Sequence, residues 1–331
     1  MRVLVAGGAG FIGSHFVKRL LAAGDEVRVL DKLTYSGNRA NLCSEVELVI
    51  GDICDTEAVA EAAADREAIV NFAAETHVDR SILGSADVIR TNVIGTYVLL
   101  EQARAAGLRL VQVSTDEVYG DVPPGAPSST ESDPLAPSSP YSAGKAGGDL
   151  QVLAHSRTYG VDALITRGSN TYGPNQYPEK LLPLFLTNAL DGEPLPMYGD
   201  GGQIRDWLYV EDHCTGIELA LRQGRAGEIY NIGGGEEATN REITNLVLEH
   251  TGADETLVRH VEDRPGHDRR YSLDTTKTRE QLGWAPHVRL AEGFPATAAW
   301  YRENRDWWEP IKHSGGYRAY YDKQYSARLA S

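Results

Sequence analysis

Short β-branched runs alternate along the first half of the chain with longer segments in which apolar residues recur at helical spacing. The short runs predict strands at Arg2–Ala6, Glu26–Asp31, Glu47–Ile50, Ala68–Phe72, Leu108–Ser114 and Ala163–Arg167. The longer segments predict helices at Ile12–Ala23, Thr56–Ala63, Ser85–Ala106 and Tyr141–Tyr159. Because continuous apolar strands are buried on both faces, these repeated units predict an α/β fold with a doubly wound parallel sheet.

The sequence pattern changes after about Gly168, where prolines become frequent and the alternation of strand and helix segments becomes irregular. Two segments keep a clear helical period, Asn240–Thr251 and Ala291–Arg305. Two others are expected to return to the main sheet as strands, Asp206–Val210 and Glu228–Ile232. We therefore expect one domain over residues 1–168 and a smaller α/β domain over 169–313 that caps the strand ends. A tail over 314–331 is expected to pack on the cap or to be mobile.

Charge and cysteine content narrow the class of protein. The 331 residues hold 32 Lys and Arg against 47 Asp and Glu, a net charge of −15 that disfavours nucleic acids and anionic membranes as partners. The three cysteines are widely spaced and form no CxxC pair, which argues against a disulfide framework or a structural zinc site. With no apparent signal peptide or membrane span, the sequence predicts a soluble cytoplasmic protein without a bound metal.

Three glycines follow the first predicted strand at the spacing GxxGxxG: Gly7, Gly10 and Gly13. Such glycines permit a tight turn, close approach of a pyrophosphate, and packing of the next helix on the strand. Glycines alone also fit an ordinary turn, but Asp31 ends the second strand, where a carboxylate binds ribose hydroxyls and repels a 2′-phosphate. The segment predicts a Rossmann domain that prefers NAD to NADP, although nearby Lys32 and Arg39 would tolerate a phosphate.

Tyr141 and Lys145 lie four residues apart on one predicted helix and therefore share a face. An ammonium beside the tyrosine is expected to lower the pKa of the phenol and make it a usable base, while also reaching the nicotinamide ribose. A helix-surface pair is the plain alternative. The hydroxyl of Thr115, at the end of the preceding strand, favours a site that moves a hydride from a secondary alcohol.

Asp116 and Glu117 directly follow that strand end. An Asp-Glu pair usually lies in a solvated loop, but here it stands where the substrate must bind. One protonated and one ionised carboxyl would supply a general acid and a general base. Alcohol oxidation needs neither, so the pair indicates a second chemical step.

These motifs resemble those of the extended short-chain dehydrogenase/reductase family, and within it the nucleotide-sugar 4,6-dehydratases. The resemblance reaches to about Trp308, and its most specific carriers are the Thr-Asp-Glu triplet at 115–117 and the run Asp263–Tyr271. It implies that Tyr141, helped by Lys145 and Thr115, takes the proton of the sugar 4-hydroxyl during oxidation by NAD. Glu117 then removes the C5 proton, Asp116 protonates the departing 6-hydroxyl, and the hydride returns to C6.

The resemblance also implies the binding residues. NAD is expected to contact Gly7, Gly10, Phe11, Ile12, Gly13, Asp31, Lys32, Thr34, Ser36, Asp52, Ile53, Phe72, Ala73, Ala74, Glu75, Thr91, Tyr141, Lys145 and Thr171. For Asp52, Ile53 and the 73–75 segment, spacing alone is explained equally well by strand-end capping. The substrate, dTDP-glucose, is expected to contact Thr76, Thr115, Asn170, Lys180, Leu181, Pro196, Tyr198, Arg205, Asn231, Asp263, Arg264, Pro265, Gly266 and His267.

Three positions depart from the family pattern. Thr171 stands where a second Asn usually contacts the nicotinamide amide, Thr76 replaces a Ser, and Gly144 replaces a Ser inside the helix. A glycine there costs about 0.5–1 kcal/mol relative to alanine unless close packing requires it. None of the three removes a catalytic group.

Proteins with other functions would use some of the same residues. A sugar-nucleotide 4-epimerase needs Tyr141 and Lys145 but not the Asp116–Glu117 pair, and a decarboxylase needs a cation for a uronate. A regulator that binds NAD without turnover would not need an intact Tyr-Lys pair. The family also forms homodimers through a four-helix bundle, which we expect of Ser85–Ala106 and Tyr141–Tyr159, with core burial as the alternative.

Overall fold

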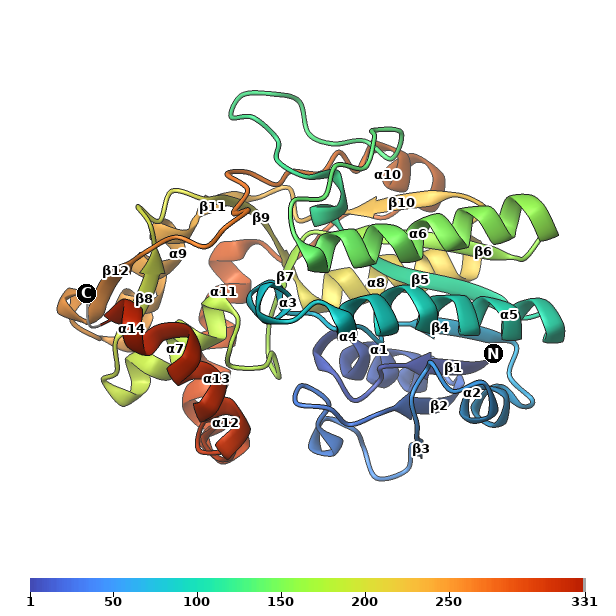
Figure 1. Cartoon of the computed structure of the whole chain (residues 1–331), viewed down its shortest axis with the longest axis horizontal. Helices are drawn as coiled ribbons and strands as arrows, with labels where there is room; N and C mark the ends of the chain where they lie inside the picture. The colour runs from blue at the N-terminus through green and yellow to red at the C-terminus, as the bar shows by residue number, and fades with distance from the viewer. Residues whose placement is uncertain (330–331) are drawn as a thin grey trace.

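The computed structural model describes residues 1–329, and its centre is a parallel sheet of seven strands in the order β10-β6-β5-β4-β1-β2-β3 (Figure 1). The strands are β1 (Arg2–Ala6), β2 (Glu26–Asp31), β3 (Glu47–Ile50), β4 (Ala68–Asn71), β5 (Arg109–Thr115), β6 (Ala163–Gly168) and β10 (Ile229–Ile232). The predicted doubly wound sheet is confirmed, with each predicted strand displaced by one residue at most in this first half. Strand β10 also confirms the predicted return of Glu228–Ile232 to the sheet.

Helices cover both faces of the main sheet, which creates two hydrophobic cores. In β1, Val3 and Val5 point to the face covered by α1 (Phe11–Ala22) and α8 (Val210–Gln223), whereas Leu4 and Ala6 point to the other. That second face is covered by α2 (Thr56–Ala63), α5 (Thr96–Ala106) and α6 (Pro140–Tyr159). Alternate residues of one strand thus bury against opposite helix layers.

The predicted helix Ser85–Ala106 is not one regular α-helix. It consists of α4 (Ala86–Val88), a π-helical segment over Ile89–Gly95, and α5. Within the π segment, the Asn92 amide accepts from the Glu75 backbone N–H at 2.9 Å and donates to its carbonyl at 3.1 Å. The wider turn therefore places a side chain against the strand-end loop that follows β4.

Glycines of α6 allow it to pack closely on this segment. A Cβ at Gly144 would lie 2.6 Å from Val88 Cγ1, and one at Gly148 would lie 2.7 Å from the Asn92 carbonyl oxygen. Close packing thus requires the glycine that departs from the family pattern. A capping box between Ser139 and Ser142 fixes the start of the helix.

The second half forms two small sheets and a helical layer. Strands β7 (Asn170–Tyr172), β9 (Ile204–Tyr209) and β11 (Glu237–Thr239) form one sheet, and β8 (Leu195–Tyr198) pairs with β12 (Val258–Val261) in the other. The prediction that Asp206–Val210 joins the main sheet is wrong, because β9 pairs with β7 and β11 instead. The helices there are α7 (Leu181–Asp191), α9 (Asn240–Thr251), α10 (Thr276–Leu282) and α11 (Leu290–Glu303).

The tail packs on the cap as far as residue 329. The tail forms α13 (Gly315–Tyr321), a π segment over Asp322–Ser326, and α14 (Ala327–Leu329), and it follows α12 (Arg305–Lys312); these helices are seen in red beside α7 in Figure 1. Its Tyr325 and Trp308 of α12 are buried in the core of the cap. The last two residues of the predicted tail, 330 and 331, lie outside the described part. The domain boundaries at 168 and 313 stay predictions.

Candidate active site

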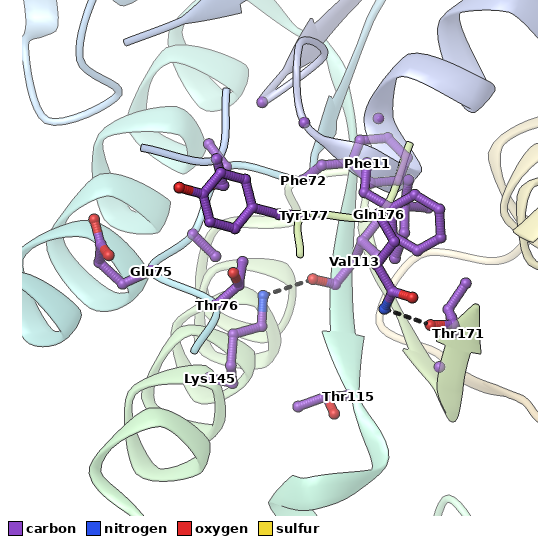
Figure 2. Close-up of a pocket in the computed structure, with 18 of the residues that line it drawn as sticks. Phe11, Phe72, Glu75, Thr76, Val113, Thr115, Lys145, Thr171, Gln176 and Tyr177 are labelled. Carbon is purple, nitrogen blue, oxygen red and sulfur yellow. Dashed lines mark hydrogen bonds between the residues drawn. The ribbon is translucent and has the colours of Figure 1, made fainter. Parts of the chain in front are cut away.

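The carboxyl ends of the main strands open into a cavity of about 320 Å³. Every residue that we predict to contact the cofactor lines it, together with Thr115, Asp116, Glu117 and Thr76. Figure 2 shows the part of this cavity where Lys145 and Thr115 lie below Phe11 and Phe72. The sequence therefore predicted residues that the fold brings together at one place.

The glycine loop is shaped for a group that approaches the backbone. Gly7 has φ +76°, and a Cβ on it would lie 2.5 Å from the Ala73 nitrogen. A Cβ on Gly13 would lie 2.3 Å from the Gly7 carbonyl oxygen. The N-cap residue of α1, Gly10, has no capping side chain, which leaves helix N–H groups available to a phosphate.

Around the expected adenosine end, the charges suit an unphosphorylated ribose. Asp31 accepts hydrogen bonds from the backbone N–H groups of Ala9 at 2.9 Å and Leu33 at 2.8 Å, so its carboxylate is held in place. The ammonium of Lys32 is paired with Asp52 at 2.9 Å. A fixed carboxylate next to a neutralised lysine fits NAD better than NADP.

Lys145 is fully buried, and its ammonium donates to the Val113 carbonyl oxygen at 2.7 Å (Figure 2). Burial lowers the pKa of Lys145 to about 8. The prediction that Lys145 lowers the pKa of the Tyr141 phenol is wrong. Burial raises the pKa of Tyr141, and the negative charges of Glu117 and Asp116 raise it further, while Thr115 opposes the rise.

Asp116 and Glu117 begin a short 3₁₀ helix, η3 (Asp116–Tyr119), in which Asp116 is buried and Glu117 is half-buried. Asp116 Oδ1 accepts from the Thr115 hydroxyl at 3.1 Å, whereas its Oδ2 has no hydrogen-bond partner in the described part of the chain. Burial, followed by the charge of Glu117, raises the pKa of Asp116 well above its ordinary value. Burial also raises the pKa of Glu117, but three cations oppose the rise: Arg264, Lys180 and Arg205. The surroundings thus hold a proton more firmly on Asp116 than on Glu117.

A second cavity adjoins the first, and Glu117, Asn170, Lys180 and Leu181 line both. Of the other predicted substrate contacts, this cavity contains Pro196, Tyr198, Arg205, Arg264 and His267. Asp263, Pro265 and Gly266 do not line either cavity, but Asp263 holds the His267 ring at 2.6 Å.

The prediction for Asn231 is wrong. Its side chain accepts from the Tyr119 hydroxyl at 2.8 Å and donates to the carbonyls of Ser129 at 3.0 Å and Asp274 at 3.1 Å, away from both cavities. Asn240, the first residue of α9, lines the second cavity instead. Its position directly after Thr239, the N-cap whose capping box with Glu242 starts α9, was a usable sequence signal.

Sequence reasoning also missed Asp79, Tyr271 and Tyr325, which line the second cavity. Asp79 binds Arg264 at 2.9 Å and accepts from the Tyr198 hydroxyl at 2.8 Å. Burial raises the pKa of Asp79, but His77 and these two contacts outweigh burial and lower the pKa to about 2. Tyr325 comes from the tail, whose sequence has no readable period.

Thr171, which stands where the family usually has an Asn, takes part in a hydrogen-bond network with Ser169 and His213. Its hydroxyl donates to the Ser169 carbonyl at 3.1 Å and lies 2.7 Å from His213 Nδ1. Burial lowers the pKa of His213 to about 3, so the ring is neutral. Within residues 1–329 no cluster of three metal-ligating side chains occurs, and none of the helices is long and apolar enough for a bilayer.

The fold and the site define an extended short-chain dehydrogenase/reductase. The family model described as GDP-mannose 4,6 dehydratase matches residues 4–297, and the chain belongs to this family. It is 56% identical to a dTDP-glucose 4,6-dehydratase from Streptomyces niveus, over 94% of this chain and 96% of the relative. The predicted membership among nucleotide-sugar 4,6-dehydratases is thereby confirmed.

Solved structures are consistent with this family membership. One is DesIV, a dTDP-glucose 4,6-dehydratase from Streptomyces venezuelae solved with NAD bound. The two structures match with a TM-score of 0.92 and 56% identity, over 94% of this chain and 100% of DesIV. A UDP-glucose 4-epimerase from Thermus thermophilus, also solved with NAD, has a TM-score of 0.87 and 36% identity over 92% of this chain and 100% of its own. The fold is thus shared with epimerases.

Proposed function

We propose that the protein is a dTDP-glucose 4,6-dehydratase, a hydro-lyase that holds NAD and makes dTDP-4-keto-6-deoxyglucose and water for deoxysugar biosynthesis. One observation carries the proposal. The Tyr141–Lys145 pair and the Asp116–Glu117 pair line the same cavity, with Glu117 at its junction with the second cavity. An oxidation site joined to an acid/base pair is what oxidation, elimination and reduction of one sugar require.

NAD, held by the glycine loop and Asp31, would supply the hydride acceptor for oxidation at sugar C4 and the hydride for reduction at C6. Tyr141 takes the proton of the 4-hydroxyl, which Thr115 orients beside it. The resulting ketone acidifies the C5 hydrogen, which Glu117 removes as a proton. Asp116, kept protonated by burial, gives its proton to the 6-hydroxyl, which leaves as water. When the hydride is added at C6, Glu117 gives a proton back to C5, and the sum of these steps is the loss of one water with no net oxidation.

The nucleotide part fits the second cavity. Arg205 and Arg264 supply guanidinium groups, and Lys180 supplies an ammonium, at the end that adjoins Glu117. Three cations within a protein of net charge −15 favour a diphosphate linked to the sugar. Tyr198 and Pro196 supply apolar surface for the base. We place the reaction in the cytoplasm because the three free cysteines suit a reducing compartment.

The test is mass spectrometry of dTDP-glucose after incubation with the protein and NAD in heavy water. We expect loss of one water, deuterium at C5 and no accumulation of the reduced cofactor. An unchanged mass with inverted configuration at C4 would replace the proposal by an epimerase. An unchanged substrate would reject dTDP-glucose.

We also propose a homodimer formed through α5, α6 and the π segment before α5. Large apolar side chains stand exposed there: Ile89 at 55%, Ile94 at 49%, Tyr97 at 46%, Leu150 at 56% and Tyr159 at 56%. Exposed apolar side chains that cluster on two adjacent helices favour a partner surface over burial within one chain. A second copy would pair these helices into a four-helix bundle.

Charge on this surface is expected to separate the subunits. Ile94→Glu with Leu150→Glu should convert a dimer into a monomer in sedimentation velocity, because the contact would bury two carboxylates per chain. Ile50→Glu is the matched control, since Ile50 is 64% exposed on β3 at the far edge of the sheet. A wild-type protein that sediments as a monomer contradicts this proposal.

A further inference from the structure

A buried ion pair lies behind Tyr141 and Lys145. Asp149 Oδ2 accepts from Arg167 Nε at 2.9 Å, and the exposed fractions of the two side chains are 0% and 1%. Asp149 follows Lys145 by one turn on α6, and Arg167 belongs to β6. Neither residue lines one of the two cavities, so neither is placed to contact a substrate.

The pair is costly as a structural device. Removing two charges from water costs several kcal/mol per ion, and well-packed apolar residues often replace such pairs without loss of stability. Hydrogen bonding of the pair is also incomplete, because within residues 1–329 Asp149 Oδ1 and Arg167 Nη1 have no hydrogen-bond partner. A contribution to stability therefore explains the buried pair poorly. A role toward Lys145, one helical turn before Asp149, explains it better.

The spacing on α6 aligns three functional groups. Residues 141, 145 and 149 follow one another at four-residue steps, which places their side chains along one face of the helix. Lys145 is buried, and among the described residues its ammonium has one acceptor, the Val113 carbonyl. A buried ammonium with a neutral acceptor needs a negative charge nearby to stay protonated.

We propose that Asp149, held by Arg167, is a positioning residue that serves as the counter-ion of Lys145 and keeps its ammonium charged. The proposal rests on the function proposed above, in which Lys145 acts with Tyr141. Arg167 is in turn fixed by the Tyr119 ring, 4.7 Å from its guanidinium carbon, and Tyr119 donates to Asn231. The carboxylate thus stands on a rigid support from β6, β10 and η3.

The surrounding charges agree with this role. Burial lowers the pKa of Lys145 to about 8, and Asp149 is the charged group that opposes the fall. Burial raises the pKa of Asp149, and Arg167 is the first group to oppose that rise, with Ser114 and Lys145 after it. From η3, Glu117 and Asp116 act on Tyr141. On the opposite side, the groups around Gly148 are uncharged: Asn92, Thr96 and Gln112.

The sign of the pH effect follows. Lys145 serves as an ammonium, so the rate of C4 oxidation falls as the pH rises through its pKa. Without Asp149 that pKa is lower, and the rate falls at a lower pH. We expect Asp149→Asn to move the alkaline limb down by about one pH unit, the size expected for one lost opposite charge.

The experiment measures single-turnover formation of the reduced cofactor against pH with dTDP-glucose and NAD. Wild type is compared with Asp149→Asn and with Asp149→Asn/Arg167→Gln, which retains a folded chain if the lone buried Arg167 unfolds the single variant. Asp191→Asn is the control, because Asp191 supports another buried lysine, Lys312, at 2.8 Å far from the site. A second readout is the titration of Lys145 in carbon-labelled protein without cofactor, followed by magnetic resonance and assigned with Lys145→Met.

The supporting result is a lower alkaline limb and a lower Lys145 titration in the Asp149 variants, with both unchanged in Asp191→Asn. If folded Asp149 variants lose rate but keep the wild-type limb and titration, Asp149 is only structural and the proposal is overturned. If wild type does not turn over dTDP-glucose, the proposed function fails, while the titration still decides whether Asp149 supports Lys145.

Discussion

Replacement of Asp116 by Asn together with Glu117 by Gln is expected to slow the loss of water from dTDP-glucose by about 10²–10⁴-fold for each lost proton transfer. Tyr141 and Lys145 remain, so C4 oxidation continues and the reduced cofactor accumulates, because no alkene forms to take the hydride back. Mass spectrometry measures the loss of water, and absorbance of the reduced nicotinamide measures the oxidation. The two readouts separate elimination from the step before it.

The matched control for this variant is the pair Asp254→Asn with Glu255→Gln. These residues have the same order in the chain but begin an exposed 3₁₀ turn away from both cavities. The control should lose water from the substrate at the wild-type rate. Unchanged dehydration by the Asp116/Glu117 variant would assign the acid and base to other groups.

Stability should move in the opposite direction to activity. The folded-state pKa of Asp116 is raised by burial, so the acid disfavours folding increasingly as the pH rises above its unfolded-state pKa. Asp116→Asn removes this pH-dependent penalty while keeping the shape of the side chain. We expect a higher midpoint of thermal unfolding at neutral pH and little gain near pH 3, below the ordinary pKa of an aspartate.

The main sheet could be predicted because its strands are buried on both faces. Each then reads as an apolar run whose ends are marked by polar or glycine residues, as at Arg2–Ala6 and Ala68–Asn71. The π segment in Ile89–Gly95 could not, because its amphipathic pattern is that of an ordinary helix. The partner of β9 also depends on which edge lies nearest in space, and no local pattern records that.

Part of the candidate site could likewise be predicted from the sequence, and part could not. Residues in the loops after β1, β4 and β5 could be placed because the carboxyl ends of parallel strands share one edge. Asn231 also follows this rule, yet the polar atoms of its amide are used by Tyr119, Ser129 and Asp274. The direction of the Tyr141 pKa shift was mispredicted because burial, which no spacing reveals, outweighs the effect expected from Lys145.

Tyr141→Phe is expected to lower the rate of C4 oxidation by about 10²–10⁴-fold, the usual loss when a positioned proton acceptor is removed. Dehydration falls equally, since elimination needs the C4 ketone. The affinity for NAD should change little, because Lys145 and the glycine loop remain. Single-turnover absorbance measures the rate, and titration of protein fluorescence with NAD measures binding.

Tyr172→Phe is the control for this change, since Tyr172 is buried on β7, directly after Thr171, but its hydroxyl has no hydrogen-bond partner among residues 1–329. It should oxidise the substrate at the wild-type rate. The pH dependence adds a stricter test: the raised pKa of Tyr141 makes wild-type oxidation increase with pH until Lys145, with a pKa of about 8, loses its proton. In Tyr141→Phe the rising limb should disappear and the falling limb remain, and a rising limb that persists would assign the base to another residue.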